Sequence, residues 1–348
     1  MQFMLRTIAL VASLVACLSW TAKSSPAAEF PLPSDGTIVG ALQMVSVESD
    51  VTLFDIARHF DLGADEIMNS NPGVDMWVPG HGRRVLVPTE FILPPRPWTG
   101  IVLNLPARRL YYFPRPGSRR PASVITFPIG IGRLDWPTPL GRTTIVAKIR
   151  NPSWVVPKTI LAEHERAGEP LPAVVPPGPD NPMGLLALRT GLPEVFIHGT
   201  NEPWGVGSLV SHGCIHLYPE DVAAIFDQVP LGTEVRIIDA PNLVGDRNGV
   251  VFLSAFQPMN DYPDLDSPAA AAVKAVMAYL GDRRVDIDWN RVAAVGLQTR
   301  TVLTPVSTAT IDVLELEPDM PARPYRFPPY GPEANSAVPP PTGAAPSP

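Results

Sequence analysis

The sequence predicts a mainly β fold with short helices, and three observations support this prediction. Proline accounts for 44 of the 348 residues, well above the roughly 5% of ordinary proteins, and this much proline disfavours long helices. Short apolar runs separated by Gly, Pro and Asn recur along the middle of the chain, as they do where strands alternate with turns. Hydrophobic residues are 45% and charged residues 18% of the chain, so most of it is expected to fold into two or three domains around one substantial core.

The charge balance excludes one class of partner. The formal net charge is −7 at pH 7, and no basic patch stands out in the sequence. Proteins that bind nucleic acid neutralise its phosphates with clustered Lys and Arg, so no nucleic-acid partner is predicted.

Residues 1–28 have the pattern of a signal peptide. Arg6 gives the segment a positive start, and the apolar run that follows, 8–20, is shorter than the about 20 residues of a spanning helix. Small residues allow cleavage near Ala27. A second interpretation stays open, because "LVAC" also fits a lipoprotein signal in which Cys17 is acylated. A permanent signal anchor is a third.

Residues 40–94 predict a small separate module with a strand, two short helices and a closing strand. Asp50 or Thr52 can cap the first helix, whose apolar residues recur at helical spacing, and Gly63 is expected to end it. The second helix, 65–70, stops at an Asn-Pro-Gly turn. The run "RRVLVP" then predicts the closing strand.

Residues 99–240 contain most of the predicted strands. Apolar runs bounded by turn residues predict them at "GIVLNLPARRLYYFP", which is two strands around a tight turn, and at "ASVITFPIGIG", "GRTTIVAKI", "SWVVP", "EVFIHG" and "GTEVRIID". A short helix is expected from Pro219, because Glu220 and Asp221 follow in the first turn, where the helix dipole favours acidic side chains. The segment 157–184 is too long for a simple connection and predicts a functional lid or cover.

Residues 241–317 predict a small α+β appendage that carries no chemical motif. Ser267 and the proline after it start a helix that Gly281 ends, and a second short helix is expected after Asp288. Residues 318–348 are so rich in proline that we expect an extended or disordered tail.

Cys214, within "SHGCIHLYPED", is the candidate catalytic residue. Both processing routes leave it as the only internal cysteine, so it has no partner for an internal disulfide. A cysteine attacks carbonyls as the thiolate, which a nearby imidazole can generate by taking the proton. His198, at the end of a predicted strand, and His212, two residues before the cysteine, are the candidate bases. Gly199 leaves the backbone beside His198 open, so that carbonyls there can fix the imidazole tautomer.

The glycine before the cysteine, Gly213, indicates an oxyanion pocket. Without a side chain it lets an acyl group approach, and the amides of Gly213 and Cys214 can point at the developing oxyanion. Two other interpretations stay open at this point. The cysteine can be a small buried apolar side chain, or it can join histidines in a zinc site, although the paired spacings typical of zinc, CxxC and HExxH, are absent. We therefore predict no metal and no cofactor.

The stretch "HGTNEPWGVGSLVSHGCIHL" resembles the signature of the YkuD family of L,D-transpeptidases. Other pieces within 100–240 are similar to the ErfK/YbiS branch of that family: "IVLNLPARRLYYFP", "FPIGIGRLDWPTPLGRTTI", "NPSW" and "LPAVVPPGPDNPMG". In the first module, "DVTLFDIARHF", "ADEIMNSNPG" and "RRVLVP" resemble LysM, the glycan-binding fold of cell-wall proteins. The resemblance implies a β-rich, sandwich-like catalytic domain over 99–240, preceded by a LysM-like wall-binding module over 40–94.

The resemblance also implies a mechanism. Cys214 would be the nucleophile and His198 its general base. His212 and Gly213 would shape the oxyanion pocket, and Ser211 would support that loop. The substrate would be a peptidoglycan stem peptide, attacked at the carbonyl of the L-centre of its meso-diaminopimelate residue with loss of the terminal D-alanine. The thioester would pass to the amine of another stem, giving a 3→3 cross-link, to the lysine of an envelope lipoprotein, or to water. The resemblance further implies that the enzyme works in the periplasm and takes part in cell-wall biogenesis and in determining cell shape.

His216 departs from the family pattern, which has Arg or Asn at that position. Because histidine is mostly neutral at pH 7 and arginine is always charged, we expect His216 to support the pocket by hydrogen bonding. Arg189 is the candidate to supply the missing charge, and Trp204 the candidate to line the substrate groove. A second hypothesis stays open, a wall-binding LysM protein with an inactive catalytic fold. The intact His198 and Cys214 favour the enzyme.

Overall fold

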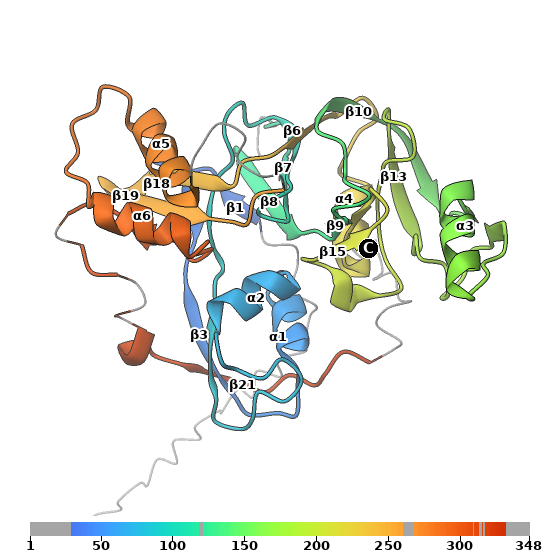
Figure 1. Cartoon of the computed structure of the whole chain (residues 1–348), viewed down its shortest axis with the longest axis horizontal. Helices are drawn as coiled ribbons and strands as arrows, with labels where there is room; N and C mark the ends of the chain where they lie inside the picture. The colour runs from blue at the N-terminus through green and yellow to red at the C-terminus, as the bar shows by residue number, and fades with distance from the viewer. Residues whose placement is uncertain are drawn as a thin grey trace, which may run out of the picture.

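The computed structural model of the protein describes residues 29–117, 121–259, 267–308, 310–312, 315 and 317–331. Its largest element is a nine-stranded sheet, which confirms the mainly β fold (Figure 1). In spatial order the strands are β1 (Glu29–Pro31), β8 (Ser123–Pro128), β7 (Arg109–Phe113), β6 (Gly100–Asn104), β17 (Glu234–Ile238), β10 (Gly141–Arg150), β13 (Leu186–Thr190), β14 (Phe196–His198) and β16 (Ile215–His216). The predicted signal peptide, with Cys17, lies outside the described residues. Within them, no helix is long and apolar enough to cross a bilayer.

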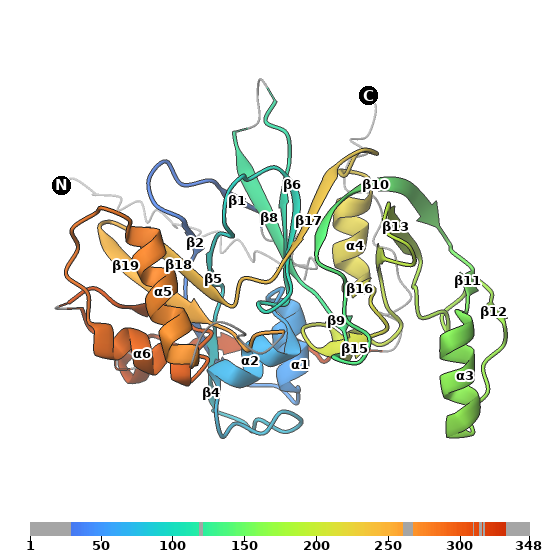
Figure 2. The same ribbon diagram turned by 45° about the horizontal axis from the view of Figure 1, so that its top comes forward.

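Helix α4 (Pro219–Phe226) packs on the apolar face of the sheet near β13, β14 and β16. It begins at Pro219, as predicted. Val222, Ile225 and Phe226 are buried in one cluster with apolar residues of these strands, and Figure 2 shows the helix lying beside β10 and β16. This packing decides which side chains of β14 and β16 point inward.

Residues 43–87 fold as the predicted strand–helix–helix–strand unit: β3 (Gln43–Val47), α1 (Leu53–His59), α2 (Ala64–Ser70) and β4 (Arg84–Val87). Thr52 caps α1, since its hydroxyl accepts a hydrogen bond from the Asp55 amide at 3.0 Å and the Asp55 carboxylate accepts one from the Thr52 amide at 2.8 Å. The expectation that Gly63 ends the first helix is wrong. Asp61, with φ of 53°, turns the chain out of α1, and Gly63 is instead the N-cap of α2.

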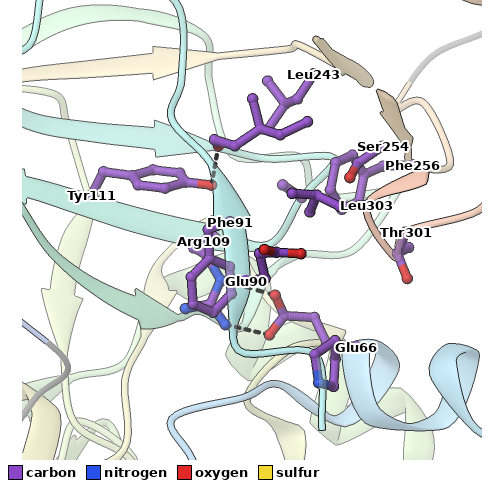
Figure 3. A pocket seen from close by; sticks show the side chains of 13 residues that line it. Glu66, Glu90, Phe91, Arg109, Tyr111, Leu243, Ser254, Phe256, Thr301 and Leu303 are labelled. Carbon is purple, nitrogen blue, oxygen red and sulfur yellow. Dashed lines mark hydrogen bonds and ion pairs between the residues drawn. The ribbon is translucent and has the colours of Figure 1, made fainter. Parts of the chain in front are cut away.

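The module, the sheet and the C-terminal part meet around a small cavity (Figure 3). Arg109 of β7 is 1% exposed and forms an ion pair there with Glu66 of α2, with 2.8 Å between Nε and Oε1. Ser254 and Leu303 line the cavity from the C-terminal side. Its volume of ≈ 30 Å³ is that of about one water molecule, so the cavity belongs to the packing between the parts.

The C-terminal part has the expected α+β composition. The hairpin of β18 (Asn242–Arg247) and β19 (Val250–Ala255) extends to β20 (Thr304–Pro305) and packs on α5 (Pro268–Leu280) and α6 (Trp289–Leu297). Both helices begin where the sequence predicts. The side chains of Ser267 and Asp288 accept hydrogen bonds from amides in the first turns.

The expectation of a disordered tail is wrong for residues 318–331. Strand β21 (Arg323–Tyr325) pairs in parallel with β3, and Tyr325 is 1% exposed. Aromatic residues alternate with the prolines here, so the segment buries rings while its extended backbone pairs with the otherwise open edge of β3. Residues 332–348 lie outside the described residues.

The predicted lid segment, 157–184, extends away from the sheet. Strand β11 (Trp154–Val155) pairs with β12 (Val174–Val175), and α3 (Lys158–Ala167) lies between them in the chain, well apart from the sheet in Figure 2. The sequence did not predict this helix. Ile160 is its only buried residue, so it has no apolar stripe to recognise.

Candidate active site

Cys214, His198 and His216 share one face at the edge of the sheet. Strands β14 and β16 run parallel, with His198 opposite His216 and Ile197 opposite Ile215. Both isoleucines are buried in the core, and successive side chains of a strand point to opposite faces. The two histidines, and Cys214 just before Ile215, therefore face away from that core. The ring centroids of His198 and His216 are 4.7 Å apart.

The Cys214 thiol is half-buried and protonated at neutral pH. Its sulfur donates a hydrogen bond to the backbone oxygen of Glu194, with 3.3 Å between Sγ and O. Burial raises the pKa of the thiol to about 11, against the opposing effect of a hydrogen bond from the Phe196 backbone. Attack on a carbonyl therefore requires a base to take the proton.

His198 has the properties of such a base. It is 3% exposed, and its Nδ1 lies 2.6 Å from the carbonyl oxygen of Gly199. A carbonyl oxygen can only accept, so the ring proton sits on Nδ1 and Nε2 is left as the acceptor. Burial lowers the pKa of His198 to about 4, so the ring is neutral at pH 7. A neighbouring carbonyl thus sets the tautomer, as the sequence led us to expect.

Ser211 holds the turn that carries the cysteine. Its hydroxyl donates to the carbonyl oxygen of Cys214 at 2.6 Å and accepts from the amide of Gly213 at 3.1 Å. Gly213 has φ of 101°, a conformation that favours glycine. The expectation that the Gly213 amide points at an oxyanion needs correction, because this amide is already used inside the turn. Of the two expected donors, the Cys214 amide remains.

Thr138 braces the same turn from the other side. Its hydroxyl donates to the Gly213 carbonyl oxygen at 3.1 Å and accepts from the Gly132 amide at 3.0 Å. Thr138 is 3% exposed, so neither bond competes with much solvent. The sequence did not predict this residue, because no local pattern relates two positions 75 residues apart.

Helix α3 of the predicted lid segment contacts His212. The Oε2 atom of Glu163 in α3 lies 2.8 Å from Nε2 of His212, and Oε1 accepts from Arg133, also at 2.8 Å. These hydrogen bonds, from His212 first and then from Arg133, lower the pKa of Glu163. The ring of Trp136 meets His212 edge-on at 5.1 Å. His212 thus links the turn before Cys214 to α3, and the sequence predicted neither Glu163 nor Arg133.

All of these residues lie within one region that matches a known family. Residues 99–237 match YkuD, the L,D-transpeptidase catalytic domain. The chain is 40% identical to the probable L,D-transpeptidase YbiS of Escherichia coli K12 over 242 residues, which cover 68% of this chain and 78% of YbiS. It is 36% identical to the probable L,D-transpeptidase ErfK/SrfK of the same strain over 293 residues, or 82% of this chain and 92% of the relative. For the probable L,D-transpeptidase YcfS of that strain the identity is 41% over 244 residues, or 68% and 75%.

The chain belongs to the YkuD family of L,D-transpeptidases. The resemblance of residues 100–240 to this family is therefore confirmed, together with its ErfK/YbiS branch. The protein is an L,D-transpeptidase enzyme.

Two of the remaining expected residues share the sheet face of Cys214 in this L,D-transpeptidase. Arg189 of β13 pairs with Phe196, which shares the face of His198 two residues later, so Arg189 also lies on the face of Cys214. It is exposed. Burial, and then the neighbouring His198, lower the pKa of His216 well below its usual value. His216 is therefore neutral, and Arg189 provides a fixed positive charge on this face.

Trp204 lies at the rim of the same region. It is 55% exposed in the short 3-10 helix Pro203–Gly205. The next residue, Gly205, packs against Gly130, whose backbone bonds to His216 at 2.9 Å in both directions. The described residues contain no group of three or more His, Cys, Asp or Glu side chains arranged to hold a metal ion.

Proposed function

We propose that this L,D-transpeptidase acts on peptidoglycan stem peptides through a thioester on Cys214, with His198 as the general base. The observation that carries the proposal is the tautomer of His198. Its Nδ1–H is fixed by Gly199, so Nε2 accepts protons on the sheet face that Cys214 shares. Arg189 adds a positive charge on that face, suited to the carboxylates of a stem peptide.

The reaction begins with two neutral groups. The thiol leaves the Glu194 carbonyl and passes its proton to Nε2 of His198 as the sulfur attacks the carbonyl of the L-centre of diaminopimelate. The Cys214 amide stabilises the oxyanion. Collapse of the tetrahedral intermediate breaks the amide bond, and the imidazolium gives its proton to the departing D-alanine amine. The product is a thioester.

A second nucleophile then resolves the thioester. His198 takes a proton from the incoming amine, the amine attacks, and the thiol recovers the proton as it leaves. The diaminopimelate amine of another stem gives a 3→3 cross-link, and the lysine of an envelope lipoprotein tethers that protein to the wall. If water resolves the thioester, the enzyme acts as a carboxypeptidase. The same residues serve all three acceptors.

The cellular setting of the proposal rests on the N-terminal part of the chain. Export to the periplasm would follow from the signal peptide at 1–28, with lipid anchoring through Cys17 as the alternative form. The LysM-like module is proposed to hold glycan. Trp77 is 61% exposed and lies 5.1 Å from Phe54, ring centroid to ring centroid, so these two aromatic rings offer a stacking surface.

Analysis of the muropeptides made by the purified enzyme tests the proposal. With disaccharide-tetrapeptide as donor, we expect loss of D-alanine and formation of dimers, tripeptides or lipoprotein adducts, according to the acceptor supplied. Cys214→Ala is expected to form none of them while still sedimenting with purified wall. Wall binding without any product from the wild type would favour the alternative, a binding protein with an inactive fold.

A further inference from the structure

The N-terminal module contacts the chain just upstream of the catalytic turn. The amide of Ala64, at the start of α2, donates to the carbonyl oxygen of Val206 at 2.9 Å. The next residue, Asp65, accepts from the hydroxyl of Ser208 at 3.2 Å. Strand β15 (Leu209–Ser211) follows immediately. The first turn of α2 therefore lies directly on the segment that leads into Ser211.

The backbones touch at two glycines. A β-carbon at Gly63 would lie 2.6 Å from the α-carbon of Gly207, closer than real β-carbons come to other atoms. The φ angle of Gly63 is −83°, which any residue adopts. Glycine is therefore required at this position by the close approach of Gly207 and not by the backbone conformation. At Gly207 the φ angle of 90° is a second reason for glycine, because residues with a side chain rarely adopt it.

The module also contacts the chain just downstream of the turn. The hydroxyl of Tyr218 donates to the carbonyl oxygen of Leu62 at 3.0 Å. Arg58 of α1 forms two hydrogen bonds with the carboxylate of Glu220, from Nε at 2.7 Å and from Nη2 at 2.8 Å. Arg58 is 5% exposed, and Tyr330 of the C-terminal tail lies over its guanidinium at 4.2 Å.

The sheet joins the base to the chain directly after the turn, whereas the module contacts the chain before the turn. His198 lies on β14, which pairs with β16, and the Leu217 amide donates to the His198 carbonyl oxygen at 2.8 Å. The module contacts residues 206–208 before the turn, and Tyr218 and Glu220 after β16. A shift of the module relative to the sheet therefore moves the upstream end of the turn against its downstream end, and this changes the position of the sulfur relative to the imidazole.

We propose that the corner formed by residues 58–65 is a positioning element of the active site, which aligns the thiol of Cys214 with His198. The proposal rests on the proposed roles of these two residues. It makes the module part of the catalytic machinery as well as a candidate wall-binding unit, because the chemical step depends on where α1 and α2 lie.

Gly63→Ala in the full-length chain tests this directly, because it inserts one methyl group between the module and Gly207 without backbone strain. Gly117→Ala is the matched control, since a β-carbon there meets nothing within 4 Å. Tyr218→Phe removes the hydrogen bond to Leu62 with little change of volume. For each variant we would measure the first-order acylation rate of Cys214 by a carbapenem, the affinity of the preceding reversible complex, and the melting temperature.

We expect Gly63→Ala to slow acylation about tenfold, as a small misplacement of reacting groups does, with the reversible affinity unchanged. Tyr218→Phe should slow acylation about threefold, consistent with the loss of one hydrogen bond, and Gly117→Ala should match the wild type. A purely structural role would lower the melting temperature and leave the acylation rate of folded protein unaltered, which would overturn the inference. If Gly63→Ala does not fold, an unchanged rate in Tyr218→Phe overturns it as well. Absence of acylation in the wild type would instead contradict the proposed function.

Discussion

Glu163 of the lid helix and His212 of the catalytic turn are joined at 2.8 Å, two residues before Cys214. The same carboxylate binds Arg133, so one side chain connects the lid to both segments beneath it. The three side chains are only partly buried, with exposures of 21–32%. Partly exposed contacts of this kind hold α3 against the two segments only weakly.

Glu163→Gln is expected to loosen the lid. The amide keeps the shape of the carboxylate but loses its charge, so the bonds to Arg133 and His212 weaken. We expect KM for the donor peptide to rise by no more than a few-fold, because an exposed ion pair contributes little, and hydrogen exchange in residues 151–184 to become faster. Glu165→Gln, on an exposed position of the same helix, is the control. Equal exchange rates in both variants would show that Glu163 does not hold the lid.

The reactivity of Cys214 should depend on pH as expected of a neutral thiol. Its pKa is raised to about 11 and that of His198 is lowered to about 4, so no thiolate–imidazolium pair forms at rest. The rate of alkylation by iodoacetamide should rise about tenfold for each pH unit between 6 and 9, as the thiolate fraction does. A plateau in that range, typical of a preformed ion pair, would contradict this assignment.

His198 should also make the fold sensitive to acid. Its pKa is about 4 in the folded protein and about 6.5 in an unfolded chain, so the unfolded state binds more protons between these values. Stability is therefore complete above pH 6.5 and falls as the pH drops through 4, by about 3 kcal/mol from this residue. Urea unfolding at pH 7.5 and pH 4.5 measures the loss. His198→Asn should show a smaller loss, and an equal loss in both proteins would exclude His198 as its source.

Thr138 should be required for the geometry of the turn. Thr138→Val keeps the shape of the side chain but leaves the Gly213 carbonyl and the Gly132 amide without their buried partner, which costs about 1–3 kcal/mol of stability. We expect acylation by a carbapenem to slow about tenfold. Thr138→Ser keeps the hydroxyl and should restore most of the rate. If Ser and Val behave alike, the hydroxyl does not matter.

Local patterns predicted the catalytic segment, while long-range contacts could not be predicted. Cys214, Ser211 and Gly213 lie together in one short stretch, and His198 ends a strand recognisable from its apolar run. Glu163 and Thr138 act through hydrogen bonds to residues 49 and 75 positions away, and no local pattern records such a pair.

The two errors in the fold have the same origin. Glycine is common at helix ends, which predicts a helix end at Gly63, but the structure requires glycine there because Gly207 approaches so closely. The tail was expected to be disordered because proline dominates its composition, although Tyr325 and Phe327 find an apolar surface on the module. In both cases the deciding partner lies far away in the sequence.

Mass spectrometry with a tetrapeptide donor and no acceptor shows whether Cys214 forms an acyl-enzyme with His198 as its base. On the intact wild-type protein we expect an adduct with the mass of the donor lacking D-alanine, and after digestion we expect it on the peptide that contains Cys214. Cys214→Ala should form no adduct, and in His198→Ala the adduct should form at least about a hundredfold more slowly. An adduct on another residue, or one that forms equally fast without His198, would mean that Cys214 and His198 do not have these roles.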